Sequence, residues 1–143
     1  MTVLDTNVLS EVLRPEPSDR VLLWLARRPP ASAYTTAITQ AELILGVELM
    51  SRGRRRSALE SAIKRILAED FADRILPFDS EAAEAFAQIA ASRKARGRPI
   101  SHSDAQIAAI VRTHNATLVT RNTADFDHCG IKVLDPWVAL RPE

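Results

Sequence analysis

Four acidic residues follow predicted strands or lie in predicted helix turns beside them, where a parallel sheet gathers its functional side chains. They are Asp5, Glu42, Asp104 and Asp125. Carboxylates brought close together repel and raise one another's pKa unless a hard cation neutralises them. Ligation by oxygen alone favours Mg²⁺ or Mn²⁺, which keep bound waters and bind substrate phosphates. Such a site activates water and offsets the charge of a phosphodiester transition state, which is nuclease chemistry.

Each acid also has an ordinary structural interpretation. Asp5 is a good N-cap for the helix that follows it. Asp104 lies in the first turn of a helix, where a negative charge complements the helix dipole. Glu42 shares a helical stripe with Ile38, Leu45 and Leu49, so it either lies among apolar side chains or emerges at one end of a buried helix. None of these interpretations explains why the acids all fall at strand ends or in the adjoining helix turns.

The surrounding pattern predicts the elements that position these residues. Strands are predicted at 2–5, 33–36, 75–78, 117–120 and 131–134. Helices are predicted over 8–13, 18–28, 39–50, 54–67, 80–96 and 101–114. Strands that alternate with helices imply βαβ units, so we expect an α/β fold with a mostly parallel, twisted sheet of four to five strands and helices on both faces. A chain of 143 residues has room for one domain, residues 1–143.

Composition limits the possible functions. The net charge is +1, from 19 basic and 18 acidic residues, so nucleic-acid binding must rest on local clusters. Basic residues gather at 52–56 and 93–98, although such runs are also typical of solvated helix ends. The single cysteine, Cys129, excludes an intramolecular disulfide and fits a reducing compartment such as the cytoplasm. No apolar run is long enough to suggest a membrane span.

Four ordered segments resemble those of bacterial PIN-domain toxins of the VapC type, and most of all the FitB-like branch. The segments are VLDTNVLSE, TTAITQAELILGV, SHSDAQIAAI and TLVTRNTADF. The branch is suggested by RPEP after the first helix, ILPFD in mid-chain and DPW near the end. These matches span nearly all of the chain, so the resemblance implies a single PIN-like domain.

The resemblance implies a Mg²⁺- or Mn²⁺-dependent endoribonuclease, the toxin of a type II toxin–antitoxin system. It implies metal ligation by Asp5, Glu42 and Asp104, while Thr6 and Asn7 orient the first acid and its water. It also implies a homodimer without membrane association, and a cognate DNA-binding antitoxin of the VapB or FitA type that covers the active site.

One position departs from the family's pattern. Many relatives carry an acid two residues after the final threonine of the fourth strand, where this chain has Asn122. Either Asn122 acts through a water molecule or Asp125 takes the fourth place. Arg121 beside this loop, together with Arg54 and Arg55, is a candidate for contact with RNA phosphates.

Other functions share some of these features. A phosphatase that uses Asp5 as its nucleophile would need a second aspartate where this chain has Asn7. A serine hydrolase is unsupported, because no serine lies in a glycine-flanked elbow. A DNA nuclease of the related flap type would use the same acids, so this alternative stays open. So does a catalytically weak domain that serves mainly as the partner of a DNA-binding antitoxin in a repressor complex, which Asn122 favours modestly.

Overall fold

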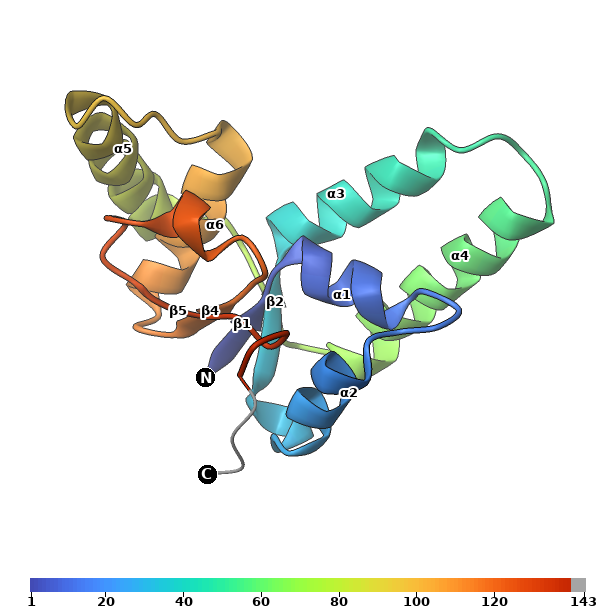
Figure 1. Cartoon of the computed structure of the whole chain (residues 1–143). Coiled ribbons are helices and arrows are strands. Elements are labelled where there is room, and N and C mark those ends of the chain that lie inside the picture. The colour runs from blue at the N-terminus through green and yellow to red at the C-terminus, as the bar shows by residue number, and fades with distance from the viewer. Residues whose placement is uncertain (140–143) are drawn as a thin grey trace.

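The computed structural model describes residues 1–139, in which one sheet lies between two layers of helices (Figure 1). Its strands are β1 (Thr2–Leu4), β2 (Ala33–Thr36), β3 (Ile75–Leu76), β4 (Thr117–Val119) and β5 (Lys132–Leu134). All neighbouring strands pair in parallel, and their order across the sheet is β3-β2-β1-β4-β5. The expected α/β fold with a mostly parallel sheet of four to five strands is confirmed, and the sheet has five strands.

The helices begin close to the residues whose side chains predict a start. They are α1 (Thr6–Val12), α2 (Asp19–Ala26), α3 (Ala37–Glu48), α4 (Arg54–Arg65), α5 (Ser80–Ala95) and α6 (His102–Thr113). Shorter helical turns are η1 (Pro30–Ser32), η2 (Ile66–Asp70) and η3 (Thr123–Phe126). The Ser101 hydroxyl accepts a hydrogen bond from the Asp104 amide, so a short polar side chain satisfies an otherwise unpaired donor at the start of α6.

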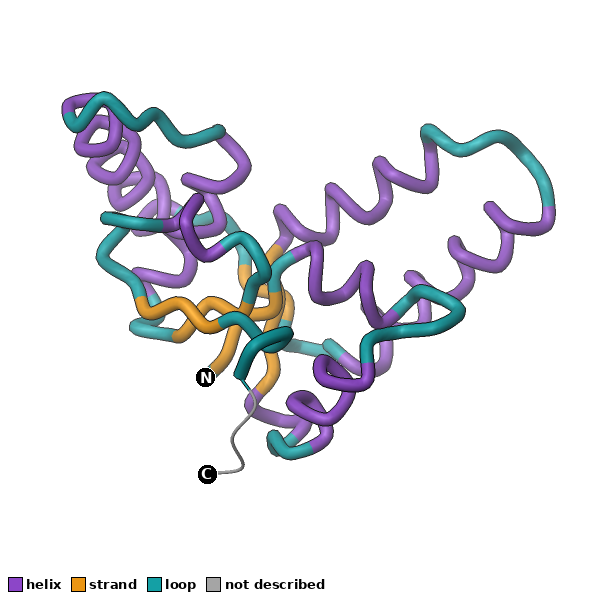
Figure 2. Tube along the Cα trace, in the orientation of Figure 1, coloured by secondary structure: helices purple, strands orange, loops and turns teal. Residues whose placement is uncertain are grey.

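Alternate residues of the short strands point to opposite faces of the sheet and build two separate cores. Val3 and Leu118 pack in the core that α5 and α6 cover. Leu4 and Val119 pack in the core that α1 to α4 cover. Each of these side chains is at most 3% exposed, and burying one contributes about 1.5–3 kcal/mol. Figure 2 shows the resulting arrangement, with helices on both sides of the strands.

The strand order reverses between β1 and β4. From β1 the chain builds β2 and β3 on one side, and it later adds β4 and β5 on the other. The Asp5 amide donates to the Val119 carbonyl at 2.9 Å, so the ends of β1 and β4 are joined at this reversal. In open parallel sheets, this reversal opens a crevice at the carboxyl ends of the strands, where ligands bind.

Helices α3 and α4 extend beyond the sheet as an antiparallel arm (Figure 1). The α3 residues buried against the rest of the protein are Thr39, Leu43 and Val47. Leu45 and Leu49 are 56% and 78% exposed, so the expected apolar stripe through Glu42 is not a buried one. This expectation was wrong because the buried side of α3 faces α1 and α4, and Glu42 lies at its border. No helix within residues 1–139 is both long and apolar enough to cross a membrane.

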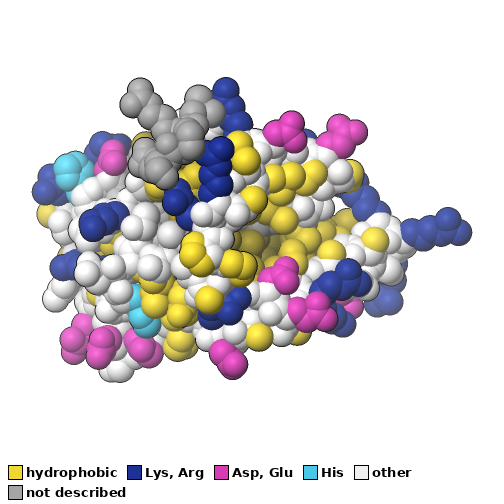
Figure 3. All heavy atoms as spheres, turned by 90° about the horizontal axis from the view of Figure 1, so that it is seen from below, with side chains coloured by type: hydrophobic (Ala, Val, Ile, Leu, Met, Phe, Trp, Pro, Cys, Tyr) yellow, Lys and Arg dark blue, Asp and Glu magenta, His cyan; other side chains and the backbone are white. Residues whose placement is uncertain are grey.

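The side of the molecule seen from below bears hydrophobic side chains near its middle and basic side chains around its edges (Figure 3). Strands β1 and β2 run upward in Figure 1, so their carboxyl ends point away from the viewpoint of Figure 3.

Candidate active site at the carboxyl end of the sheet

A cleft of about 510 Å³ opens beside the ends of β1 and β4. Three of the four predicted acids line it, namely Asp5, Glu42 and Asp104. They come from the start of α1, the middle of α3 and the first turn of α6, so the fold unites residues that are far apart in the sequence. The cleft also contains the predicted residues Thr6, Asn7, Arg121 and Asn122.

The floor of the cleft consists of Asp5, Thr6, Asn7 and Thr120. Asp5 is 5% exposed, and its Oδ1 accepts a hydrogen bond from the Thr6 amide at 2.8 Å. Its Oδ2 accepts from the Thr120 hydroxyl at 2.8 Å and from Asn7 Nδ2 at 3.4 Å. Asn7 also donates to Thr120 Oγ1 and accepts from the Arg121 amide at 3.1 Å. The Asp5 carboxylate is therefore held in one orientation.

Burial raises the pKa of Asp5 above its ordinary value of 3.8. Hydrogen bonds from Thr120 and Thr6 oppose this shift, and the charges of Asp104 and Glu42 add to it. Placing a negative charge here without a counter-ion is therefore unfavourable, and a cation in the cleft would reverse the effect.

The wall of the cleft consists of Glu42, Asp104 and Asn122. The Thr6 hydroxyl donates to Glu42 Oε1 at 2.6 Å and so connects the floor to the wall. Asp104 is half-buried, and burial raises its pKa while a hydrogen bond with Ser101 opposes the rise. Charges of Asp125 and Glu42 also raise the pKa of Asp104. The wall thus carries acids that repel one another at half-exposed positions.

The fourth acidic place is divided between two residues. Asn122 lines the cleft, and its backbone N–H donates to Thr120 Oγ1 at 3.2 Å. Asp125 lies in η3, is exposed, and is not part of the lining, although its charge acts on Asp104. Of the two, Asn122 is the residue that lines the cleft, and a catalytic role for Asp125 stays a prediction.

The donor set of the cleft suits a hydrated hard cation. Within residues 1–139, no three Asp, Glu, His or Cys side chains converge tightly enough to enclose a metal ion by themselves. Mg²⁺ does not require such a cage, because it keeps several waters and binds through one or two carboxylates and substrate phosphates. Three carboxylates and an amide around an open cleft therefore fit Mg²⁺ or Mn²⁺.

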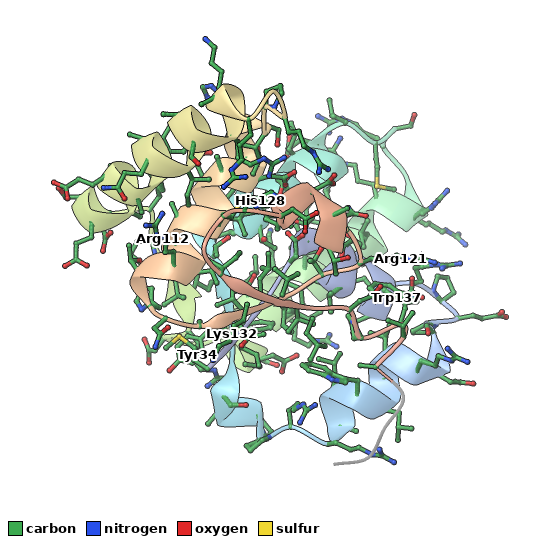
Figure 4. All side chains as sticks on the ribbon, turned by 60° about the vertical axis from the view of Figure 1, so that its left-hand side comes forward. Tyr34, Arg112, Arg121, His128, Lys132 and Trp137 are labelled. Atoms are coloured by element: carbon green, nitrogen blue, oxygen red, sulfur yellow. The ribbon has the colours of Figure 1, made fainter. Side chains whose placement is uncertain are left out.

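The predicted RNA-binding arginines occupy different surroundings. Arg121 lines the cleft, and its guanidinium lies 4.9 Å from the centre of the Trp137 ring. The two residues are labelled next to each other in Figure 4. Arg55 lines a second groove of about 470 Å³ between α1, α3 and α4, which is mainly apolar. This groove shares four lining residues with the cleft, namely Thr6, Ser10, Arg14 and Glu42. Arg54 is exposed at the start of α4 and lines neither hollow.

The basic run at 93–98 does not form one RNA-binding surface. Arg93 is 5% exposed, and its Nη1 donates to the carbonyls of Asp125 and Asp127 at 2.8 and 3.1 Å. Its Nε donates to the Arg98 carbonyl at 2.7 Å. The interpretation of the 93–98 run as a nucleic-acid-binding cluster was wrong for Arg93. A buried guanidinium needs hydrogen-bond acceptors, and Arg93 finds them in the backbone of the η3 loop.

Comparison with known proteins decides the family. Residues 2–132 match the family model described as the PIN domain. The chain belongs to the PIN-domain family. Toxin FitB of Neisseria gonorrhoeae is 42% identical over 137 residues, covering 96% of this chain and 99% of that protein. VapC ribonuclease Y4jK of Sinorhizobium fredii is 36% identical over 137 residues, covering 96% and 98%.

The same likeness holds in three dimensions. The solved structure of FitAB bound to the IR36 DNA fragment matches this PIN domain with a TM-score of 0.91 and 39% identity, covering 100% of both chains. The resemblance to VapC-type and FitB-like toxins inferred from the four sequence segments is confirmed.

Several residues of the PIN-domain cleft were not predicted from the sequence. Thr120 supports Asp5, while Glu11, Arg14 and Trp137 line the cleft. Thr120 could have been found, because it is the last residue of a predicted strand and therefore lies beside the acids. Glu11 and Arg14 gave no comparable signal, since an i,i+3 pair of opposite charges is common on solvated helices.

Proposed function

We propose that this PIN-domain protein is a Mg²⁺- or Mn²⁺-dependent endoribonuclease and the toxin of a toxin–antitoxin pair. The observation that carries the proposal is the convergence of Asp5, Glu42 and Asp104 in one cleft at the strand-order reversal. The relatives named toxin FitB and VapC ribonuclease cover nearly the whole chain and support the same activity.

In this proposal, Asp5, Glu42 and Asp104 would hold the metal. A bound metal would supply an activated water and neutralise charge on the scissile phosphate. The floor hydrogen bonds fix the Asp5 carboxylate, and the Thr6 hydroxyl fixes Glu42. Asn122 has an amide that can hold a water or an RNA oxygen beside the acids.

Arg121 is proposed to contact an RNA phosphate next to the scissile one. Its stacking on Trp137 limits its motion, and a guanidinium matches the geometry of a phosphate. Arg55 and Arg54 are proposed to guide the RNA backbone toward the cleft from the α3–α4 arm. Asp125 is proposed to act through its charge on Asp104.

The proposed partners are a cognate DNA-binding antitoxin and a second copy of this chain. Solved structures similar to this chain include a FitAB complex bound to DNA and, at 24% identity, a DNA-bound VapBC complex. Ile44, Leu45 and Leu49 leave apolar surface on α3 that a second copy could cover. Light scattering of the purified chain tests the dimer.

A second candidate function is favoured by the DNA-bound FitAB structure and by Asn122. In it, the chain has little nuclease activity and acts mainly as the partner of a DNA-binding antitoxin in a repressor complex. An amide in place of an acid lowers the negative charge of the cleft and hence its affinity for metal.

One experiment separates the two functions. The purified chain, free of antitoxin, is incubated with structured RNA and with DNA in Mg²⁺, Mn²⁺ or EDTA. The Asp5→Ala and Asp104→Ala variants test the site, and Glu84→Gln on the exposed side of α5 is the matched control.

The nuclease proposal expects metal-dependent RNA cleavage that both alanine variants lose and the control keeps. Cleavage of DNA alone would assign the protein to the flap-type nucleases. Folded protein that cleaves nothing in either metal would favour the repressor partner. Cleavage that survives both alanine substitutions would mean that the metal site is elsewhere.

A further inference from the structure

A buried acid on α1 restrains an arginine at the edge of the cleft. Glu11 is 6% exposed, and its Oε2 accepts a hydrogen bond from the Ser18 amide at 2.8 Å. Both carboxylate oxygens also accept from Arg14 Nη1, at 3.2 and 3.3 Å. The Ser18 amide, and then Arg14, hold the pKa of Glu11 below its ordinary value. Glu11 is therefore a charged anchor that is itself fixed to the backbone.

Arg14 lies at the far end of a polar row that begins beside the proposed metal site. Asn7, Ser10, Glu11 and Arg14 all line the cleft. Ser10 and Glu11 come three and four residues after Asn7, and Arg14 comes three residues after Glu11, so the row follows one side of α1 to just past its end. Five residue steps of helix from Asn7 to Val12 rise about 7.5 Å, and Arg14 lies two residues beyond the end of α1. Arg14 is thus placed to meet the substrate beyond the scissile bond.

The guanidinium of Arg14 is restrained, but most of its hydrogen-bond donors have no acceptor in the described residues. The Arg14 side chain is 63% exposed, and within the described residues only its Nη1 donates to the protein. An arginine carries five N–H donors, so most of the donors of Arg14 face the cleft or solvent. An exposed i,i+3 ion pair contributes little to stability, so the pairing of Arg14 with Glu11, which both line the cleft, leaves Arg14 available for a further role.

A second restrained guanidinium lies within the same cleft. Arg121 stacks on Trp137 at 4.9 Å, and its amide is held by Asn7. The charge of Arg121 also contributes to the lowered pKa of Glu11, so the two arginines share this acid as a neighbour. The cleft therefore has an acidic part around Asp5 and a basic part around Glu11.

We infer that Arg14 binds a backbone phosphate of the RNA next to the scissile one, and that Glu11 is its positioning residue. The inference rests on the proposed nuclease function and adds a second phosphate contact to that of Arg121. A fork of N–H donors held by a fixed carboxylate is preorganised for a phosphate, so little side-chain entropy is lost on binding. Both contacts are independent of base identity and favour single-stranded or looped RNA that can enter the cleft.

The test measures binding without cleavage. A short fluorescein-labelled single-stranded RNA is titrated in EDTA, and anisotropy gives Kd over a range of KCl concentrations. Loss of one phosphate contact lowers the slope of log Kd against log salt by about 0.7 for a single strand. Arg14→Met is expected to show this change and to weaken binding about tenfold, as for one charge-assisted hydrogen bond. Arg27, the exposed C-cap residue of α2, lies outside the cleft, so Arg27→Met should keep the wild-type slope.

Two further variants separate positioning from simple charge. Arg14→Lys keeps the charge but loses the fork, so it should bind more weakly than wild type yet keep the slope. Glu11→Gln removes one negative charge from the protein, which by itself would tighten RNA binding. If Glu11 positions Arg14, this variant binds RNA more weakly despite its more positive net charge. Circular dichroism and melting curves confirm that the variants compared are folded.

The outcomes distinguish this inference from the proposed function. An unchanged slope in folded Arg14→Met, or an equal loss in Arg27→Met, overturns the inference and leaves Arg14 for contact with a protein partner. Tighter binding by Glu11→Gln overturns the positioning role. Binding with the expected slopes but no cleavage in Mg²⁺ or Mn²⁺ would refute the nuclease and leave the phosphate site in place.

Discussion

The floor and the wall of the cleft use carboxylates in opposite ways. Asp5 in the floor is almost fully buried and accepts hydrogen bonds from three neighbours. Asp104 in the wall is half-buried and is surrounded by the charges of Glu42 and Asp125. Hydrogen bonds fix the first acid before any cation arrives, whereas the second gains most when a cation does. The difference suggests that the floor sets geometry and the wall sets affinity.

The largest expected effect is on activity and comes from the wall. Asp104→Asn removes a ligand charge but keeps the shape, so cleavage of RNA in Mg²⁺ should fall by about 10³-fold or more, as when a main source of transition-state charge stabilisation is lost. Steady-state cleavage rates measure this. Because the substitution also relieves repulsion in metal-free protein, the variant should melt at or above the wild-type temperature in EDTA. A large loss of stability would mean that Asp104 is structural.

The floor is expected to respond in the opposite sense. Thr120→Val removes the hydroxyl that donates to Asp5 and accepts from Asn7 and from the Asn122 amide. Leaving these buried groups unsatisfied costs about 1–3 kcal/mol, which denaturant unfolding in EDTA would detect. Thr120→Ser keeps the hydroxyl and serves as the control. Equal stability of the valine and serine variants would show that this network does not hold the floor.

The pH dependence of stability provides the next comparison. The pKa values of Asp5 and Asp104 are raised above 3.8 in the folded protein, so between 3.8 and the raised values the native state binds more protons than the unfolded state. In the metal-free protein, the contribution of these acids to the free energy of unfolding therefore falls as the pH rises through that window. The melting temperature of Asp104→Asn relative to wild type in EDTA should be highest near pH 7 and converge toward wild type near pH 4.

Mg²⁺ supplies the complementary measurement. Mg²⁺ should raise the wild-type melting temperature more at pH 7 than at about pH 4.5, because at the lower pH protons compete with the cation for the carboxylates. Asp104→Asn should show a smaller rise. An equal rise for both proteins at every pH would place cation binding outside the wall.

The fold was predictable because its signals are local. Strands ended by polar residues and helices opened by Ser101 or Asp5 predict the alternating elements, and alternation predicts a parallel sheet. The three acids of the cleft followed from the same rule, since carboxyl ends of parallel strands share one edge. Their metal-binding role stays a prediction.

What could not be predicted depends on tertiary packing. Arg93 and Arg55 belong to similar basic runs, yet Arg93 is buried against backbone carbonyls and Arg55 lines an open groove. Charge runs alone do not distinguish these fates, because burial of an arginine depends on acceptors supplied by distant loops. The prediction of a buried apolar stripe through Glu42 was wrong for the same reason. Periodicity identifies the sides of a helix but not which side the rest of the protein covers.

The smallest expected effect tests whether Asn122 or Asp125 takes the fourth place beside the three acids of the cleft. Asn122 lies in the wall and Asp125 lies outside the lining, so Asn122→Asp should add a charge directly to the cleft. The variant is expected to bind Mn²⁺ several-fold more tightly, because each added carboxylate favours a hard cation. It should also be less stable than wild type in EDTA through repulsion from Asp5 and Asp104. Calorimetric titration with Mn²⁺ measures the first effect and melting curves the second.

Asp125→Asn is the matched change outside the lining, and it should leave Mn²⁺ affinity less altered. If Asp125→Asn has the larger effect, Asp125 swings into the cleft when a cation binds, and the wall is completed from η3 instead of from Asn122.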